Sequence, residues 1–321
     1  MKVLVIGGSG HIGTYLVPRL VLSGHEVMNI SRGMKAPYHE HPAWNHVKNV
    51  HLDRKEGEMQ GTFGREIASL DPEVVIDLIC FEPESAHMLV EALRGKIQQL
   101  IMCCTIWVHG HSVQVQTRES APRNPFGDYG IKKAEIEAYL LNEARKNGFP
   151  AAILHPGHIV GPGWPPLNPA GNFNPQVFQI LARGEELTLP NLGMETVHHV
   201  HADDVAQAFL RTMENWSVSK GESFHIVSEA ALTLRGYAEK VGSWFGKETR
   251  LNFIPWKEWK RTVSEEDAQF TWDHIAHSPN VSIEKAKQLL GYRPRYSSLE
   301  AVYEAVQWLI VNGVIDTGNY P

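Results

Sequence analysis

Short runs of apolar residues, many of them β-branched, alternate along the first half of the chain with longer segments whose apolar positions recur at helical spacing. Such alternation predicts a doubly wound α/β fold, a parallel sheet with helices on both faces. The predicted strands are the apolar run ending at Ile6, then 25–30, 47–52, 74–79, 100–108, 151–154 and 222–227, and the predicted helices include 12–22, 84–94 and 129–146.

The apolar run at the N-terminus ends in glycines and leads directly into a helix-compatible run. Glycine permits positive φ and lets the backbone approach a ligand closely. The helix that follows points free N–H groups and the positive end of its dipole at whatever lies above the turn. Gly7-x-x-Gly10-x-x-Gly13, which also reads as Gly8-x-Gly10-x-x-Gly13, has the spacing of the dinucleotide fingerprint. We therefore predict a bound dinucleotide with its pyrophosphate over this turn.

Turn-forming residues become frequent after His155, in Pro156-Gly157 and again from Gly161 to Pro166. Such a segment marks a boundary and a loop over a site. Beyond it the pattern is largely helical, with helices expected at 234–245, 282–290 and 299–312. We predict a dinucleotide-binding Rossmann domain formed by residues 1–160 plus 196–227. Residues 161–195 plus 228–321 are expected to form a smaller, mostly helical substrate lobe.

The composition, 43% hydrophobic and 21% charged residues in a chain of 321, is that of a globular protein. The formal net charge is −6 and no basic stripe stands out, which disfavours nucleic acid as a partner. Cys80, Cys103 and Cys104 are expected to be packed thiols in a reducing compartment. The N-terminal apolar run is too short for a signal peptide, and no run is long enough to span a membrane. We expect a cytoplasmic protein without a membrane partner.

The second predicted strand is followed by Ser31-Arg32-Gly33. In nucleotide-binding folds an acidic residue at this point receives the ribose hydroxyls of the adenosine. A carboxylate would repel a 2′-phosphate, whereas Arg32 can pair with one in a forked geometry. The charge therefore favours NADP over NAD as cofactor. The alternative is that Arg32 is an ordinary solvated residue.

Tyr129 and Lys133 are four residues apart at the start of a predicted helix, so they lie on one face. A phenol with its usual pKa of about 10 is a poor acid or base at neutral pH, but a nearby ammonium lowers that pKa. Tyr129 can then move a proton to or from a carbonyl or alcohol while a nicotinamide takes or gives hydride. Such a pair also arises by chance on helix surfaces.

The predicted fifth strand supplies a third group. Because side chains alternate along a strand, we expect Thr105, Trp107 and His109 to share one face. Thr105 lies near the carboxyl end of the strand, where ligands bind in open α/β sheets. Its hydroxyl can bind the same carbonyl that Tyr129 protonates. Trp107 either walls the substrate or packs in the core.

Together these motifs resemble the extended short-chain dehydrogenase/reductase superfamily, the NAD-dependent epimerase/dehydratase group, over nearly the whole chain. The resemblance also rests on the loop from His155-Pro156-Gly157 to Gly161-Pro162 and on the run from His201 to Ala206. It implies Tyr129 as general acid/base, Lys133 as the group that lowers its pKa and binds the nicotinamide ribose, and Thr105 in the Ser/Thr role. The expected cofactor-binding residues are Gly7, Ser9, Gly10, His11, Ile12, Gly13, Ser31, Arg32, Asp53, Ile79, Cys80, Tyr129, Lys133 and Pro156, and the expected substrate-binding residues are Trp107, His158 and Trp164.

Two departures from the superfamily pattern bear on the reaction. Its sugar 4,6-dehydratases follow the threonine with Asp-Glu, whereas Ile106 and Trp107 cannot transfer a proton. Its nucleotide-sugar epimerases usually have a diphosphate-binding arginine at the position of Val197, and often asparagine at that of His158. A site without these anchors should bind a dianionic nucleotide poorly, since buried phosphate oxygens need charged or N–H partners. We expect a smaller or less charged substrate.

The leading hypothesis is thus an NADP-preferring oxidoreductase acting on a carbonyl or alcohol. An epimerase, acting on a nucleotide sugar or sugar with retained cofactor, is the nearest rival. A rival of another class is a non-catalytic RNA- or cofactor-binding relative, because Ser31-Arg32-Gly33 also resembles the start found in chloroplast stem-loop RNA-binding proteins. The joint presence of Thr105, Tyr129 and Lys133 argues against that rival.

Two further expectations concern metals and assembly. His199 and His201 alternate on a strand-like run, a spacing that can bind zinc. The run from His201 is nevertheless the ordinary element of this superfamily before a helix, so we expect no metal. Relatives often dimerise through the helix bearing Tyr129 and its neighbour, so the resemblance implies a homodimer.

Overall fold

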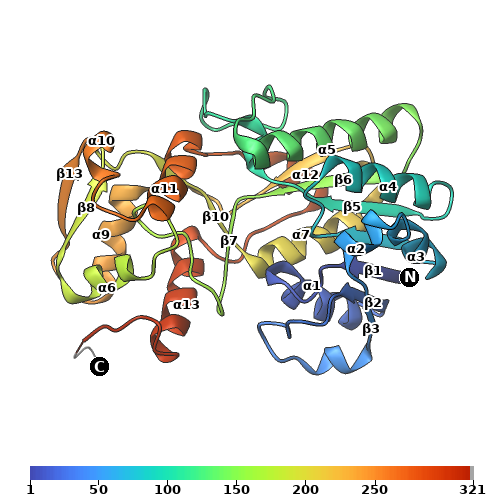
Figure 1. The fold of residues 1–321 in the computed structure, drawn as a ribbon, viewed down its shortest axis with the longest axis horizontal. Helices are drawn as coiled ribbons and strands as arrows, with labels where there is room; N and C mark the ends of the chain where they lie inside the picture. Colours follow the sequence, from blue (N-terminus) through green and yellow to red (C-terminus); the bar gives the residue numbers. More distant parts are fainter. Residues whose placement is uncertain (319–321) are drawn as a thin grey trace.

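A computed structural model describes residues 1–318 of the chain. At its centre lies a seven-stranded parallel sheet with the strand order β11-β6-β5-β4-β1-β2-β3 (Figure 1). Its strands are β1 (Lys2–Ile6), β2 (Glu26–Ser31), β3 (Val47–His51), β4 (Val74–Asp77), β5 (Gln99–Cys103), β6 (Ala151–Pro156) and β11 (Ser223–Ile226). The doubly wound α/β fold predicted from the sequence is confirmed.

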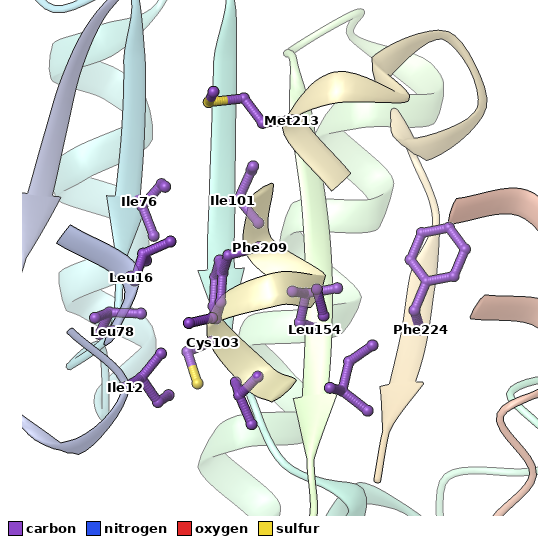
Figure 2. Close-up of a cluster of buried hydrophobic side chains, with 14 of the residues drawn as sticks. Ile12, Leu16, Ile76, Leu78, Ile101, Cys103, Leu154, Phe209, Met213 and Phe224 are labelled. Carbon is purple, nitrogen blue, oxygen red and sulfur yellow. The ribbon is translucent and has the colours of Figure 1, made fainter. Parts of the chain in front are cut away.

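Helices cover both faces of this sheet. One face carries α1 (His11–Leu22), α7 (Ala202–Glu214) and α12 (Glu284–Leu290). The other face carries α3 (Phe63–Ser69), α4 (Pro83–Leu93) and α5 (Gly127–Lys146). This half of the molecule also contains α2 (Arg54–Met59), α8 (Trp216–Ser219) and a short 3-10 helix, η1 (Pro42–His46). Figure 2 shows Leu16 and Phe209 packed against apolar side chains of the central strands. Every residue of β4, β5 and β6 is buried, as expected for parallel strands covered on both faces.

A second core, which includes Phe178, Tyr237 and Trp259, lies at the left of Figure 1, and β7 and β10 run between the two cores. Around the second core lie α6 (Gln176–Arg183), α9 (Leu234–Trp244), α10 (Trp256–Trp259), α11 (Glu265–His277) and α13 (Ser298–Val311), with the strand pairs β8 (Glu186–Pro190) and β13 (Arg250–Ile254), and β9 (Thr196–Val197) and β12 (Leu232–Thr233). The pair between the cores is β7 (His158–Val160) and β10 (His199–His201). None of the helices within residues 1–318 is long and apolar enough to cross a membrane.

One segment of the predicted substrate lobe returns to the first core. Val281, Ile283 and Tyr292 are buried with the residues of α1 and α7, and α12 packs on β11. The domain boundary predicted at residue 228 stays a prediction. The segment from Val281 to Tyr292 was assigned to the substrate lobe, but it packs on the core of the dinucleotide-binding half.

The strand predicted over residues 100–108 is wrong in its second half. β5 stops early, and Ile106–His109 forms a 3-10 helix, η2. The Thr105 hydroxyl accepts a hydrogen bond from the Trp107 N–H at 3.3 Å and so caps this turn. A threonine that bonds its own backbone two residues on competes with strand pairing. Strand alternation therefore does not place Thr105, Trp107 and His109 on one face; His109 instead contacts the buried His225, with their Nε2 atoms 2.8 Å apart.

Candidate active site

The glycine turn between β1 and α1 is shaped by two steric requirements. Gly7 has a φ of +85°, a region that favours glycine. A Cβ atom at Gly13 would lie 2.0 Å from the Gly8 carbonyl oxygen, so α1 packs on the turn only because residue 13 lacks a side chain. At Gly10 a Cβ atom would meet only the Gly7 carbonyl oxygen, at 3.4 Å. The space above Gly10, the N-cap of α1, is therefore open to an anion.

A cleft of about 650 Å³ extends from this turn along the ends of β1, β2 and β3. Its volume is that of an ordinary cofactor or ligand site. Arg32, Lys35 and Lys55 are exposed cations on its lining. The predicted cofactor residues on this lining are Gly7, Ser9, Gly10, Ser31, Arg32, Asp53 and Ile79. An open glycine turn joined to a cation-rimmed cleft fits the adenosine and pyrophosphate parts of a dinucleotide.

Arg54 lies in the wall of this cleft, although no sequence motif predicted a role for it. Its Nη1 atom donates to both carboxylate oxygens of the buried Asp77, at 2.9 and 2.8 Å, and its Nε atom donates to Glu58 at 2.6 Å. Among residues 1–318, its Nη2 atom has no hydrogen-bond partner although it is buried. The neighbouring Asp53 caps α2 by accepting the Glu56 N–H at 3.1 Å. Arg54 is thus held rigidly in the cleft wall by Asp77 and Glu58.

Tyr129 and Lys133 lie one turn apart on α5, as predicted. The Lys133 ammonium is 5.8 Å from the centre of the Tyr129 ring and is almost fully buried. It donates to the carbonyl oxygens of Cys80, at 2.7 Å, and Cys103, at 2.9 Å, so the ends of β4 and β5 hold it in place. Burial works to lower the pKa of Lys133, but the acidic groups around it, Cys104, Tyr129, Cys103 and Cys80, together outweigh burial and the pKa is raised. The ammonium therefore stays charged at neutral pH.

The Tyr129 hydroxyl is enclosed although 41% of the residue is exposed. Enclosure raises its pKa, while the Lys133 ammonium and a hydrogen bond with the Thr105 side chain work to lower it. Lys133 and Thr105 thus act in the expected direction, but burial is the larger effect. The hydroxyl keeps its proton at neutral pH.

A buried polar network links Thr105 to α5. His155 Nδ1 lies 2.8 Å from the Thr105 carbonyl oxygen, and His155 Nε2 lies 2.9 Å from Glu137, two turns beyond Tyr129. Arg123 donates two hydrogen bonds to the same carboxylate, at 2.8 and 2.6 Å. Burial works to raise the pKa of Glu137, but His155 and Arg123 outweigh it and hold that pKa well below its usual range. The network fixes Thr105 relative to the helix that bears Tyr129.

Trp107 stands beside Tyr129, in an edge-to-face contact with ring centres 5.8 Å apart. One face of its indole stacks on His277, with ring centres 4.2 Å apart, and His274 makes a near-perpendicular ring contact with it at 5.2 Å. Both histidines come from α11, which the hydrophobic pattern did not reveal. The Ser264 cap followed by acidic residues 265–267 is a helix-start signal that would have located it.

Trp164 packs at the cofactor turn. Its ring stacks on His11, at the start of α1, with centres 3.7 Å apart, and meets Tyr38 at 4.9 Å. His11 in turn contacts the Tyr38 hydroxyl through Nε2 at 3.0 Å. Trp164 thus contacts the first residue of α1, and the substrate-binding role expected for it stays a prediction.

The other predicted residues are placed as follows. Ile12 is buried in the first core, and Pro156 ends β6. His199 Nε2 faces the Leu167 carbonyl oxygen at 3.0 Å, whereas His201 accepts the Asp203 N–H at 3.0 Å. Within residues 1–318, no three His, Cys, Asp or Glu side chains are placed to hold a metal ion together.

Comparisons with known proteins point to one family. The sequence model of the NAD dependent epimerase/dehydratase family matches residues 3–226. The chain is 27% identical to the chloroplast stem-loop binding protein of 41 kDa b of Arabidopsis thaliana, over 95% of this chain and 78% of that one. It is 25% identical to 2′-dehydrokanamycin reductase of Streptomyces kanamyceticus, over 86% of this chain and 76% of that one.

Among solved structures, UDP-glucuronic acid 4-epimerase from Bacillus cereus, in complex with UDP-glucuronic acid and NAD, has the same fold. The TM-score is 0.73 at 18% identity, and the match covers 97% of this chain and 100% of that one. At this identity the likeness concerns the fold alone.

Proposed function

The chain belongs to the NAD dependent epimerase/dehydratase family, and we propose that it is an oxidoreductase that transfers hydride between a nicotinamide dinucleotide and a carbonyl or alcohol substrate. One observation carries this proposal. Thr105, Tyr129 and Lys133 meet at the carboxyl end of the sheet, and Ile79 and Phe81 beside them line the cleft that fits a dinucleotide. Ligands of open α/β sheets bind at this end.

The side chains divide the proton chemistry among them. The bound nicotinamide supplies or accepts the hydride. The Tyr129 hydroxyl gives its proton to the carbonyl oxygen in reduction, and the Thr105 hydroxyl orients that oxygen. The Lys133 ammonium stabilises the phenolate that Tyr129 becomes. The raised pKa of Tyr129 keeps the hydroxyl protonated at neutral pH, which suits the direction of reduction.

We propose NADP as the preferred cofactor. Its 2′-phosphate would meet Arg32, with Lys35 and Lys55 near it on the lining of the cleft. NAD-binding folds have an acidic residue at the position of Ser31. The Ser31 hydroxyl is uncharged, so it can donate or accept a hydrogen bond without repelling a phosphate. Three carboxylates share this lining, those of Asp53, Glu58 and Glu82. Glu58 is paired with Arg54 and Glu82 with Lys132, and the acceptance of the Glu56 N–H by Asp53 supports a role in capping α2.

We also propose a homodimer formed through α4 and α5. Met88 on α4 and Ile131 on α5 are exposed apolar side chains, at 37% and 42%. The stacked rings of His87 and Tyr139, 3.8 Å apart, already join these two helices into one surface. Sedimentation at several protein concentrations, with Ile131→Glu as the disrupting variant, tests the proposal. A wild-type monomer throughout would refute it.

Turnover with free cofactor tests the proposed function against its rivals. One sample of the purified protein is denatured to show whether it retains a nucleotide, and NADPH oxidation by the native protein is followed with carbonyl compounds. Oxidation of many equivalents of NADPH per protein supports the oxidoreductase. Substrate interconversion with a retained, internally cycling cofactor would instead favour the epimerase.

The similarity to a chloroplast stem-loop binding protein makes RNA the other candidate partner. An electrophoretic shift assay at increasing salt addresses it directly. Tight RNA binding with a steep salt dependence, together with no hydride transfer, would overturn the enzyme proposal.

A further inference from the structure

Four aromatic rings from separate segments form one continuous stack beside Tyr129. Trp107 of η2 stacks on His277, the last residue of α11, with ring centres 4.2 Å apart and planes inclined by 13°. His277 stacks in turn on Phe126, the N-cap of α5, at 3.9 Å and 22°. Phe126 stacks on His111 at 4.3 Å and 18°. We refer to Trp107, His277, Phe126 and His111 as the ring stack.

The order of these rings interleaves the two halves of the molecule. One face of an imidazole is too small to hold two parallel rings at this distance, so Trp107 and Phe126 lie on opposite faces of His277. Trp107 and Phe126 belong to the half that carries the seven-stranded sheet. His277 belongs to α11, which Ile275 anchors in the second core at the left of Figure 1. The last turn of α11 is therefore clamped between two rings of the other half.

Hydrogen bonds from the segment after η2 close the same joint. The last four carbonyl groups of a helix have no partner within that helix. At the end of α11, His111 Nδ1 donates to the Ala276 carbonyl oxygen at 2.6 Å, and the Ser112 N–H donates to the His277 carbonyl oxygen at 3.2 Å. The Ser112 hydroxyl also donates to the Ser278 carbonyl oxygen, at 2.7 Å. These bonds cap α11 and hold the rings at stacking distance.

Two rings of the stack reach the proposed acid/base. Trp107 makes an edge-to-face contact with the Tyr129 ring, with centres 5.8 Å apart. Phe126 precedes the first residue of α5, and Tyr129 is the third residue of that helix. Tyr129 is 41% exposed, and Phe81, another ring beside it, is itself half exposed. The orientation of Tyr129 therefore depends on where Trp107 and the start of α5 are held.

We propose that Phe126 and His277 are positioning residues for the proton transfer, because their stacking keeps Trp107 and the first turn of α5 in register with α11. Among the described residues, neither ring makes a ring contact with Tyr129 itself, so each acts through Trp107 or through the helix start. The inference rests on the proposed function and deepens it, since it concerns the same proton-transfer step. A misplacement of about 1 Å at a reacting group can lower a rate about a hundredfold.

Variants at these two positions separate the ring from the rest of the side chain. Phe126→Leu and His277→Leu remove the ring and keep an apolar side chain. Phe126→Tyr and His277→Phe keep a ring in the stack, and the second of these removes both ring nitrogens. The matched control is Phe253→Leu, a half-buried phenylalanine packed on the second core beneath Arg235.

Steady-state kinetics use NADPH and a carbonyl compound that the wild type reduces. We expect each leucine variant to lower kcat about tenfold with an unchanged Kd for NADPH. The variants that keep a ring, and Phe253→Leu, should retain the wild-type kcat. The double leucine variant should be no slower than the slower single variant, because both rings act through one stack. Losses that multiply, or a raised KM with unchanged kcat, would overturn the inference.

Fluorine NMR of protein labelled with fluorotyrosine gives a measurement that needs no turnover. The Tyr129 line is assigned from its absence in Tyr129→Phe. Both leucine variants should move this line, whereas Phe126→Tyr, His277→Phe and Phe253→Leu should leave it in place. An unmoved Tyr129 line in both leucine variants would overturn the inference even where hydride transfer occurs. A moved line in a protein without hydride transfer would instead refute the proposed function and leave the coupling of the ring stack to Tyr129 intact.

Discussion

The two sides of Tyr129 offer opposite chemistry to a ligand. The cofactor side presents the first N–H groups of α1 and the exposed cations Arg32, Lys35 and Lys55. The substrate side presents the Trp107 ring, on which the buried, neutral imidazoles of His274 and His277 pack. Anion recognition is thus concentrated where the dinucleotide would lie.

The proton-transfer step between the two sides carries the largest expected effect. Tyr129→Phe removes the hydroxyl but keeps the ring beside Trp107. We expect turnover to fall by about a thousandfold, in the range typical of a lost general acid, with cofactor affinity nearly intact. Steady-state kinetics and an NADPH binding titration check this. Tyr139→Phe on the same helix is the control, and wild-type turnover by Tyr129→Phe would refute the assignment.

The glycine turn allows a matched pair of variants on the cofactor side. Gly13→Ala places its Cβ atom against the Gly8 carbonyl oxygen, so we expect it to lower the free energy of unfolding by about 1–3 kcal/mol. Gly10→Ala meets no such obstacle and should fold normally, yet its methyl group enters the space predicted for the pyrophosphate. Urea unfolding and calorimetric NADP titration separate the two effects. Equal NADP affinity of Gly10→Ala and the wild type would contradict the predicted position of the pyrophosphate.

Arg32 tests which cofactor the cation-rich rim selects. Losing a charge-assisted hydrogen bond costs about 2 kcal/mol, so Arg32→Asp should shift the NADP-to-NAD affinity ratio about thirtyfold towards NAD. Fluorescence titration with each cofactor measures the ratio. Arg65→Asp, an exposed arginine on α3, is the control. An unchanged ratio would show that Arg32 does not contact the 2′-phosphate.

The substrate side should reveal itself through pH, with the smallest effect. Burial lowers the pKa of His199 to about 4, whereas an unfolded imidazole titrates at about 6.5. Between these values the unfolded chain binds more protons, so stability is full above the upper value and declines as the pH falls towards the lower one. From pH 7 to about 5.5, His199→Phe should lose about 1 kcal/mol less than the wild type. Urea unfolding curves with equal pH dependence would contradict a neutral His199.

Much of the fold follows from local sequence patterns. The glycine turn, the apolar strands and the spacing of Tyr129 and Lys133 depend on neighbours within a few residues. Residue 105 shows where such reasoning fails, since capping by the Thr105 hydroxyl ends β5 early and replaces a strand with a 3-10 helix. Hydrophobic alternation does not register this competition between a side chain and the backbone ladder.

Contacts distant in sequence were beyond sequence reasoning. His274 and His277 reach Trp107 only because α11 folds back over the site, and Trp164 reaches His11 across the two halves of the chain. The composition shows many histidines but not which of them meet. The neutrality of His199, His274 and His277 depends on burial, which a single sequence does not specify residue by residue.

The division between the two sides is tested most directly by calorimetric titration of UDP into the protein saturated with NADP. With the anion-binding groups occupied by NADP, no charged group is left beside the neutral imidazoles to bind UDP. The titration should therefore show no saturable heat up to about 1 mM UDP. A dissociation constant in the micromolar range, weakened by added salt, would place a second phosphate site beside Tyr129. That result would contradict the account.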